Sequence, residues 1–407
     1  MYREKKIMRN KKITILLLSI VFTVVLGVYY AQPFLANSQN SSFDFTVVEG
    51  NLSEIENLHY TTAMENDGSM FLDISPKGTE RLDSVLLGSI YTYQSSDMKR
   101  WQDEYRSFMR KKQYSYTNFM EEEDALFYIG DYTRNWNEDG VNKVVIEIEK
   151  LDKKTKKVTT KEINMEFPDI IEFISYQSIS KAGPYLAVQA YVNTAQTQKY
   201  TTYIYNWETG EVVDEIEVSD SFDNLSDDTD LNIEVLDKNN LKFLLNKRNY
   251  SFGDVPGQEG EDEKIENNYQ IYDPESKDTE KVLLPYELTD YEMSYVVEGG
   301  NMIFVEKKED HFLITVFDVE NQKVRKEKII PIEPSTFSEE SYFHVIKQDS
   351  KLLITQMYIN PGNSHVGIVV VNLDSVEKTF EGKIELTNQS KEELKNRGIN
   401  FESVYFE

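Results

Sequence analysis

Cysteine is absent from the chain, and histidine is scarce. None of the 407 residues is cysteine and only four are histidine. The first absence excludes a disulfide framework, a thiolate zinc site, an iron–sulfur cluster and a cysteine nucleophile. The histidines are His59, His311, His344 and His365. Their spacing does not match a metal-ligand motif, so we expect no metal centre built from these residue types.

Positive charge is also in short supply. The chain has 44 lysine and arginine residues against 71 aspartate and glutamate residues, which gives a formal net charge of −27 at pH 7. A nucleic-acid backbone requires a basic binding face, so this balance argues against such a partner. The glycine-rich motifs that hold nucleotide phosphates are missing too. We therefore expect neither nucleic acid nor nucleotide as a ligand.

The N-terminus departs from this acidic background. Residues 1–12 hold six basic residues and one acidic residue, and the nineteen residues 13–31 carry no charge. At about 1.5 Å per residue, this apolar stretch is long enough to cross the hydrocarbon core of a bilayer. Basic residues favour the cytoplasmic side. We predict a cytoplasmic tail over 1–12, a transmembrane signal-anchor over 13–31, a tether over 32–42 and an extracytoplasmic domain over 43–407.

Cleavage after the apolar segment is the alternative, and it would give a secreted protein. Cleavage favours small residues three positions and one position before the cut. A cut after Ala31 would put Tyr29 at the first of these positions, and a cut after Ala36 would put Phe34 there. Lipid attachment would need a cysteine. We therefore predict a retained single-pass anchor in the cell membrane.

Short strands separated by polar turns dominate the sequence from residue 43 onward. Runs rich in Val, Ile, Tyr, Phe and Thr are broken by Asp, Asn, Gly and Lys, which is typical of antiparallel hairpins. In one recurring hairpin, an apolar strand leads into a polar turn. The positions aligned at this turn are Asp73, Lys150, Asn206, Asp273, Asp318 and Asn372, at intervals of 77, 56, 67, 45 and 54 residues. The recurrence indicates six repeated units.

Each unit contains four consecutive strands where the repeat is most complete. Residues 291–332 show four such strands, and the following unit repeats them. This pattern resembles the β-propeller class, in particular its divergent WD40-like and TolB-like members, over most of residues 50–390. The resemblance implies an all-β fold of about six four-stranded antiparallel blades, with seven as the alternative. A β-sandwich pair or an irregular β-solenoid is the other architecture that fits the pattern.

Both ends of the predicted domain have the composition of strands. These segments are residues 43–48 and residues 401–406. A ring of sheets needs its ends joined, because an open edge strand promotes aggregation. We expect the two segments to pair with each other and close the ring.

A helical insert interrupts the strands at residues 97–112. Trp101, Tyr105, Phe108 and Met109 follow helical spacing and form one apolar face. Basic residues surround this face and form the only basic cluster that we identify outside the cytoplasmic tail. The residues predicted to contact a partner or a membrane surface are Lys99, Arg100, Trp101, Arg106, Arg110, Lys111 and Lys112. The alternative is that the aromatic face packs on a blade while the cations stay solvated.

One loop carries half of a calcium-binding pattern. Asn135, Asn137 and Asp139 precede Gly140 with the spacing of the first half of such a loop. The second half departs from the pattern, because Ile146 stands where a bidentate glutamate is expected. A hairpin turn is the simpler interpretation. We therefore expect no cofactor, with Ca²⁺ as the one candidate.

No sequence motif assigns a catalytic residue. The G-x-S-x-G elbow of α/β-hydrolases is missing. Propellers commonly present loops for contact with proteins or polymers. We predict a non-enzymatic, membrane-anchored binding or scaffold protein whose partner is another membrane or envelope protein. The alternative is an exported hydrolase or lyase for glycans or lactones, with carboxylates at the propeller axis.

The retained anchor can be tested on the exported protein itself. N-terminal sequencing of the mature chain should return residues that precede position 31, because neither candidate cleavage site has small residues at both required positions. A mature N-terminus near Ala31 or Ala36 would instead identify a secreted protein.

Overall fold

The computed structural model describes most of residues 43–407. The described residues are 43–64, 70–82, 96–110, 112, 118–136, 142–167, 171–194, 198–220, 227–237, 241–251, 264–285, 288, 294–337, 343–358, 365–387 and 399–406. No helix within these ranges is long and apolar enough to cross a membrane. The predicted tail, anchor and tether of residues 1–42 lie outside the described residues.

The part of the chain that the structure describes is all-β, with its strands in six antiparallel sheets. The strands are β1 (Phe43–Gly50), β2 (Leu58–Met64), β3 (Met70–Ser75), β4 (Gly78–Leu82), β5 (Phe119–Glu121), β6 (Ala125–Trp136), β7 (Asn142–Asp152), β8 (Val158–Phe167), β9 (Ile171–Ala182), β10 (Tyr185–Thr194), β11 (Gln198–Asn206), β12 (Glu211–Asp220), β13 (Asp227–Asp237), β14 (Lys242–Ser251), β15 (Lys264–Asp273), β16 (Asp278–Val282), β17 (Ser294–Glu298), β18 (Asn301–Lys307), β19 (His311–Asp318), β20 (Lys323–Pro331), β21 (Phe343–Gln348), β22 (Lys351–Tyr358), β23 (His365–Asn372), β24 (Glu377–Leu386) and β25 (Ile399–Phe406). A 3-10 turn, η1 (Leu52–Ile55), follows β1.

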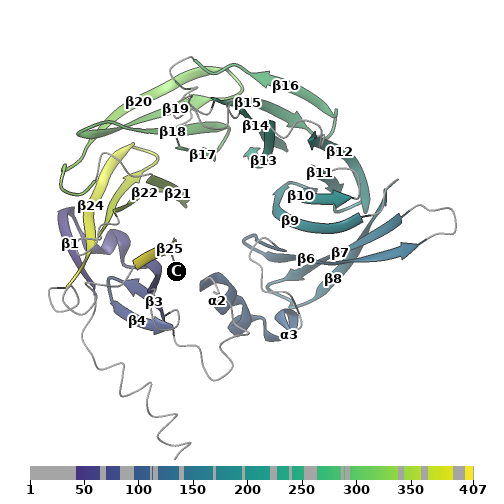
Figure 1. Cartoon of the computed structure of the whole chain (residues 1–407), viewed down its shortest axis with the longest axis horizontal. Helices are drawn as coiled ribbons and strands as arrows, with labels where there is room; N and C mark the ends of the chain where they lie inside the picture. Colours follow the sequence, from purple (N-terminus) through teal and green to yellow (C-terminus); the bar gives the residue numbers. More distant parts are fainter. Residues whose placement is uncertain are drawn as a thin grey trace, which may run out of the picture.

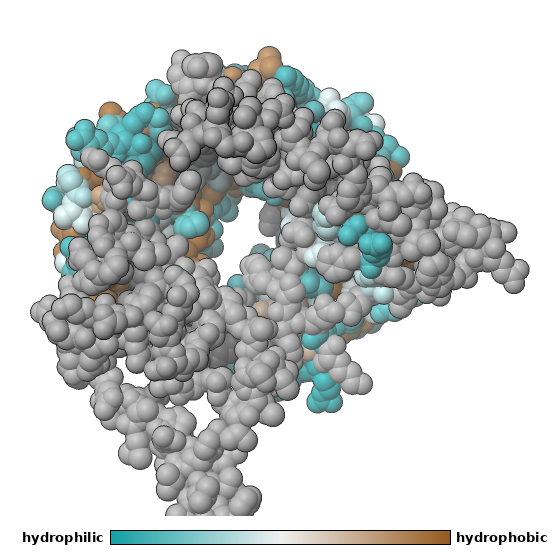
Figure 2. Space-filling view, in the orientation of Figure 1, coloured by the Kyte–Doolittle hydropathy of each residue, from teal (hydrophilic) through white to brown (hydrophobic). Residues whose placement is uncertain are grey.

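The sheets follow one another around a ring (Figure 1). We number them in order: sheet 1 is β25-β2-β3-β4, sheet 2 is β5 to β8, sheet 3 is β9 to β12, sheet 4 is β13 to β16, sheet 5 is β17 to β20, and sheet 6 is β21 to β24 with β1 added. The first strands of neighbouring sheets contact one another in the series β5, β9, β13, β17 and β21. The space-filling view is hollowed at the centre (Figure 2). This arrangement is propeller-like.

Apolar side chains fill the space between neighbouring sheets. Separate buried clusters join sheet 2 to 3, sheet 3 to 4, sheet 4 to 5, sheet 5 to 6, and sheet 6 to 1. Large rings such as Tyr203, Phe243 and Phe304 are almost completely buried in them. Burial of apolar area at about 25 cal/mol per Å² makes these contacts the main source of stability. Each sheet therefore depends on its neighbours for a covered face.

The two chain ends close the ring, but they do not pair with each other as expected from the sequence. β25 pairs antiparallel with β2, from Leu58 opposite Phe406 to Met64 opposite Ile399. β1 pairs antiparallel with β24 and becomes a fifth strand of sheet 6. The prediction of a direct pair was wrong because each terminal strand finds an open edge in a different sheet. Both terminal strands nevertheless reach the junction of sheets 6 and 1, where Phe43 of β1 is in the buried cluster and Val404 of β25 packs against it.

The turn between the third and fourth strands has the same structure in sheets 2 to 6. Its first residue is Asp152, Asn206, Asp273, Asp318 or Asn372, and the side-chain oxygen of that residue accepts a hydrogen bond from a backbone N–H two or three positions later. The fifth residue has a positive φ: 59° at Lys156, 82° at Gly210, 61° at Lys277, 49° at Gln322 and 54° at Val376. This turn is the physical basis of the repeat.

The structure corrects the repeat at two of the six aligned positions. Lys150 lies inside β7, and the equivalent turn begins two residues later at Asp152. Asp73 lies inside β3 opposite Glu80, because sheet 1 has a tighter turn between Ser75 and Gly78. Lysine at position 150 lacks the side-chain acceptor that the turn needs, so the alignment chose the wrong register there.

Contacts between the outer strands and these turns link successive sheets. Lys161 on β8 donates to the backbone oxygen of Glu208 at 3.0 Å in the turn of sheet 3. Lys326 on β20 donates in the same way to the backbone oxygen of Ser375 at 2.6 Å in the turn of sheet 6. The outer rim is thus held by hydrogen bonds as well as by the apolar clusters.

Removing the turn's acceptor should destabilise the domain. Asn206 Oδ1 accepts from Glu208 N at 2.9 Å and Thr209 N at 3.0 Å, so Asn206→Ala should lower the free energy of unfolding by about 1 kcal/mol. Gly210→Ala should cost about 1–2 kcal/mol, because φ is 82° there. Denaturant unfolding measures both changes. Glu208→Ala, at an exposed position of the same turn, is the matched control and should change stability little.

Candidate functional site

The candidate site is the insert between sheets 1 and 2 (Figure 1). It contains two short helices, α2 (Ser96–Glu104) and α3 (Arg106–Met109), where the sequence predicted a single helix over 97–112. The helix breaks at Tyr105, whose φ of −123° and ψ of 40° are not helical, and it ends before the extended backbone of Arg110. The prediction of a single helix was therefore wrong. The break allows the aromatic side chains on both sides of it to reach the same sheet.

The aromatic stripe of the insert is buried against sheet 2. Trp101 is 1% exposed, and its ring centroid lies 5.3 Å from that of Phe119 on β5. Tyr105, Phe108 and Met109 belong to the same buried cluster. The cluster also contains residues of β6 and β7, so the insert is anchored across several strands. Trp101 therefore packs in the interior and does not line the surface, contrary to its predicted role in partner contact.

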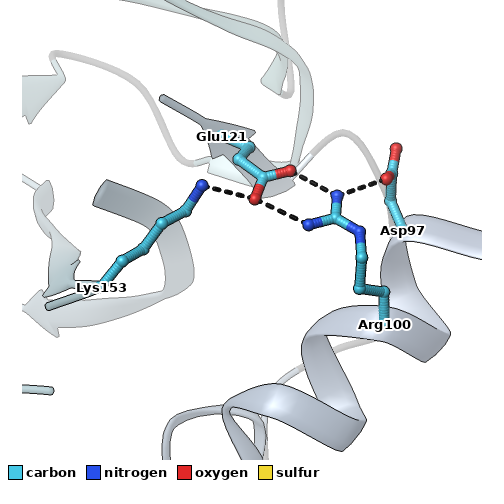
Figure 3. Close-up of polar contacts among 4 residues, drawn as sticks. All are labelled: Asp97, Arg100, Glu121 and Lys153. Carbon is cyan, nitrogen blue, oxygen red and sulfur yellow. Dashed lines mark hydrogen bonds and ion pairs between the residues drawn. The ribbon is translucent and has the colours of Figure 1, made fainter. Parts of the chain in front are cut away.

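A network of four charged side chains fixes α2 to sheet 2 (Figure 3). Arg100 donates to both carboxylate oxygens of Glu121, at 3.0 and 2.6 Å, and to Asp97 at 2.6 Å. Lys153, in the turn after β7, lies 2.6 Å from the same Glu121 carboxylate. A bidentate arginine–carboxylate pair has a defined geometry. The network thus sets the orientation of α2 on the sheet.

The charges of this network shift the pKa of Glu121. Partial burial of Glu121 raises the pKa of its carboxyl, but hydrogen bonds from Arg100, Lys153 and Trp101 outweigh burial and lower it to about 2. The hydrogen bond to Glu121 likewise raises the pKa of Arg100. Glu121 is therefore ionised throughout the physiological range and acts as an anionic clamp.

Lys112 forms a second attachment of the insert. Its ammonium lies 2.5 Å from Glu149 on β7 and 4.2 Å from the ring centroids of Phe108 and Tyr128. The side chain is 7% exposed. Lys112 was predicted to contact a partner, but these contacts direct its charge toward sheet 2.

The remaining predicted contact residues divide between exposed and undescribed positions. Arg106 is 79% exposed at its side chain and interacts with Asp103 at 3.4 Å. Arg110 is exposed as well. Lys99 lies on α2, but its side chain is outside the described residues, as is the whole of Lys111. The outer side of the insert thus presents Arg106 and Arg110.

A second basic segment lies beside the insert and was missed in the sequence. The turn between β7 and β8 contains Lys153, Lys154, Lys156 and Lys157. Lys156 lies 4.1 Å from the ring centroid of Tyr105, and Lys153 bonds Glu121 in the network described above. The signal was visible as a lysine-rich run, but its nearness to the insert depends on the tertiary structure.

The calcium-loop candidate is only partly described. Asn135 lies on β6 opposite Lys143 of β7, while Asn137 and Asp139 lie outside the described residues. Among the residues that the structure describes, no group of three or more His, Cys, Asp or Glu side chains could hold a metal ion.

Every described carboxylate whose pKa is shifted has a lowered pKa. These carboxylates are Glu121, Asp152, Asp310 and Asp318. At Asp318 burial raises the pKa, but hydrogen bonds from Asn321 and Arg325 outweigh it. A general acid for glycoside cleavage needs a raised pKa. These four carboxylates are instead held in the ionised form.

Comparisons with known proteins identify no family. No protein-family model matches the chain, and a search of curated proteins finds no match. Among solved structures, an apocarotenoid oxygenase from Synechocystis aligns with a TM-score of 0.43 and 12% identity over 88% of this chain and 96% of that chain. The polysaccharide lyase Uly1 aligns with a TM-score of 0.34 and 10% identity over 63% of this chain and 57% of that chain. An uncharacterized protein from Listeria monocytogenes EGD-e aligns with a TM-score of 0.30 and 9% identity over 65% of this chain and 83% of that chain. These values assign neither activity nor ligand.

The network around Glu121 predicts a pH-dependent contribution to stability. The pKa of Glu121 is lowered from 4.5 to about 2. The contribution of its ionised carboxylate to the free energy of unfolding is therefore complete above pH 4.5 and is lost as the pH falls toward 2. The shift corresponds to about 3 kcal/mol, reduced by roughly half for a side chain that water reaches. Glu121→Gln should therefore destabilise the domain by about 1–2 kcal/mol at pH 7 and flatten this part of the stability profile.

Denaturant unfolding between pH 6 and pH 3 measures this effect. Glu123→Gln is the matched control, because Glu123 is an exposed residue of the same β5–β6 turn, and it should keep the wild-type pH dependence. An unchanged pH dependence in Glu121→Gln would show that the network does not stabilise the insert.

Proposed function

We propose that this chain is a membrane-anchored, extracytoplasmic binding or scaffold protein, built as a six-bladed β-propeller that presents its helical insert to another membrane or envelope protein. Residues 13–31 would hold it in the cell membrane, with residues 1–12 in the cytoplasm. The six sheets in ring order support the propeller, and the charge asymmetry of the N-terminus supports the topology.

One observation carries the proposal of a binding role. The insert is fastened on its inner side by the buried aromatic cluster and by the Glu121 network, while Arg106 and Arg110 are exposed on its outer side. A preorganised element loses little conformational entropy when it binds, which favours its use as a contact surface. Acidic groups on a partner would complement these arginines.

The carboxylates favour this role over a glycoside hydrolase. A glycosidase that uses two carboxyl groups needs one of them to stay protonated near neutral pH. The four described carboxylates with shifted pKa values are all shifted downward. Each of them lies in a turn or in the network that holds the insert, which supports a structural role.

Site-specific crosslinking from the insert tests the proposal in intact membranes. A photo-crosslinking residue at Ser107, an exposed position on α3, should capture a reproducible partner of the full-length chain. Neutralising Arg106, Arg110 and Lys111 together should lower the crosslinked yield about tenfold, because three surface contacts of about 0.5 kcal/mol each sum to about 1.5 kcal/mol.

The control triple variant carries the same change in charge elsewhere on the ring. Lys277, Lys281 and Lys323 are exposed residues of sheets 4 and 5, and replacing all three with glutamine should leave the yield unchanged. Equal yields from the wild type and the insert variant would exclude the insert as the contact surface.

A further inference from the structure

The repeated turn provides an internal standard for recognising unusual residues. All five copies require an acceptor at the first position and a positive φ at the fifth, but the third position has no such constraint. Four copies place an acidic residue there, namely Glu208, Glu275, Glu320 and Asp374. The copy in sheet 2 has Lys154 instead, with Lys157 three residues later. The fold does not require this charge reversal, because the other copies form the same turn without it.

This exceptional turn adjoins the exposed side of the insert. Lys156 of the turn covers the Tyr105 ring at 4.1 Å, and Tyr105 immediately precedes α3. Lys154 and Lys157 are exposed, as are Arg106 and Arg110 on the insert. Two segments that are about fifty residues apart in the sequence thus meet at the Lys156–Tyr105 contact, and each of them carries exposed cations. We call Arg106, Arg110, Lys154 and Lys157 the basic surface.

We propose that the basic surface is a docking site for an acidic polypeptide segment of the partner. This inference rests on the proposed binding function and adds to it the turn of sheet 2 and the chemistry of the ligand. Carboxylates of an extended acidic segment would pair with the lysines of the turn and the arginines of α3. Complementary charges of this kind steer association and select the partner.

The charge pattern favours a polypeptide over a lipid surface. Asp103, Glu104, Glu123 and Asp124 are exposed residues of α2 and the β5–β6 turn, next to the cations. A flat anionic bilayer would repel these acids while it attracted the lysines and arginines. The aromatic stripe that could enter a bilayer is buried, with Trp101 1% exposed. A polypeptide, in contrast, can place individual carboxylates opposite individual cations.

Binding of a defined acidic probe tests the proposal. The full-length chain in a neutral detergent is titrated with a fluorescent, glutamate-rich peptide of roughly twelve residues at about 0.15 M salt. The double variant Lys154→Glu with Lys157→Glu gives the turn the acidic character of the other copies. It should weaken peptide binding by about tenfold or more, because it replaces attraction with repulsion at two positions.

The matched control is Lys277→Glu with Lys281→Glu on sheet 4. Both residues are exposed, and Lys277 occupies the fifth position of the same repeated turn. The control changes the net charge by the same amount, but at a distance where salt with a screening length of about 8 Å removes most of its effect. Peptide affinity should therefore change by less than about twofold.

The outcomes separate this proposal from its alternatives. Equal weakening by both double variants would overturn it, since net charge alone would then explain binding. Unchanged affinity of the Lys154→Glu with Lys157→Glu variant for the peptide would also overturn the proposal. Binding to vesicles of phosphatidylglycerol in preference to the peptide, lost in the sheet 2 variant, would replace the polypeptide with a membrane surface. If the turn variant leaves peptide binding unchanged while the insert triple variant still lowers Ser107 crosslinking, this inference fails and the proposed function stands.

Discussion

Closure of the ring is the constraint on which the rest of this structure depends. At five of the six junctions an apolar face of one sheet is covered by the next sheet, so a ring left open at any of them would expose two faces to water. The pairing of β25 with β2 and of β1 with β24 prevents this at the junction of sheets 6 and 1. Phe43, Ile55 and Leu58 are buried there at 3% exposure or less. The terminal strands β1 and β25 therefore both contribute to the core, through Phe43 and Val404.

The junction of sheets 1 and 2 differs from the other five. The buried cluster described there joins the helical insert to sheet 2, where the other junctions join one sheet directly to the next. β5 is only three residues long, and it contributes Phe119 and Glu121 to the attachment of the insert. Burial of Trp101 and Phe108 supplies the binding energy of this attachment, while the Arg100–Glu121 pair selects one orientation. An irregularity in the ring is thus used to build a rigid surface feature.

Much of the fold could be predicted from the sequence because strand alternation and turn chemistry are local. Asn206, Asp273, Asp318 and Asn372 were aligned correctly as equivalent positions, since each needs a short side-chain acceptor to form the same turn. Lys150 was misaligned because an apolar strand followed by charged residues fits two registers equally well. The single helix over 97–112 was inferred from periodicity, which does not show where the backbone must bend to bury both halves of the stripe.

The candidate site was harder to predict than the fold. The sequence shows which insert residues are cationic, but not which of them bond sheet 2. Arg100 and Lys112 bond carboxylates of sheet 2, whereas Arg106 pairs with Asp103 of the insert itself and Arg110 is exposed. Partner carboxylates such as Glu121 and Glu149 come from strands that periodicity does not relate to the helix. The lysine turn of sheet 2 escaped notice for the same reason.

The sequence by itself determined the all-β composition, the aromatic stripe of the insert and the asymmetry of charge, and it indicated about six repeated units, because these properties depend on residue type and on neighbours within a few positions. Only the tertiary structure decided how the ends close the ring, which cations are exposed, and that the turn of sheet 2 lies beside α3. Those features depend on contacts between residues far apart in the chain, such as Lys156 with Tyr105 and Lys153 with Glu121. Local patterns place no constraint on such contacts until the sheets have packed around the ring.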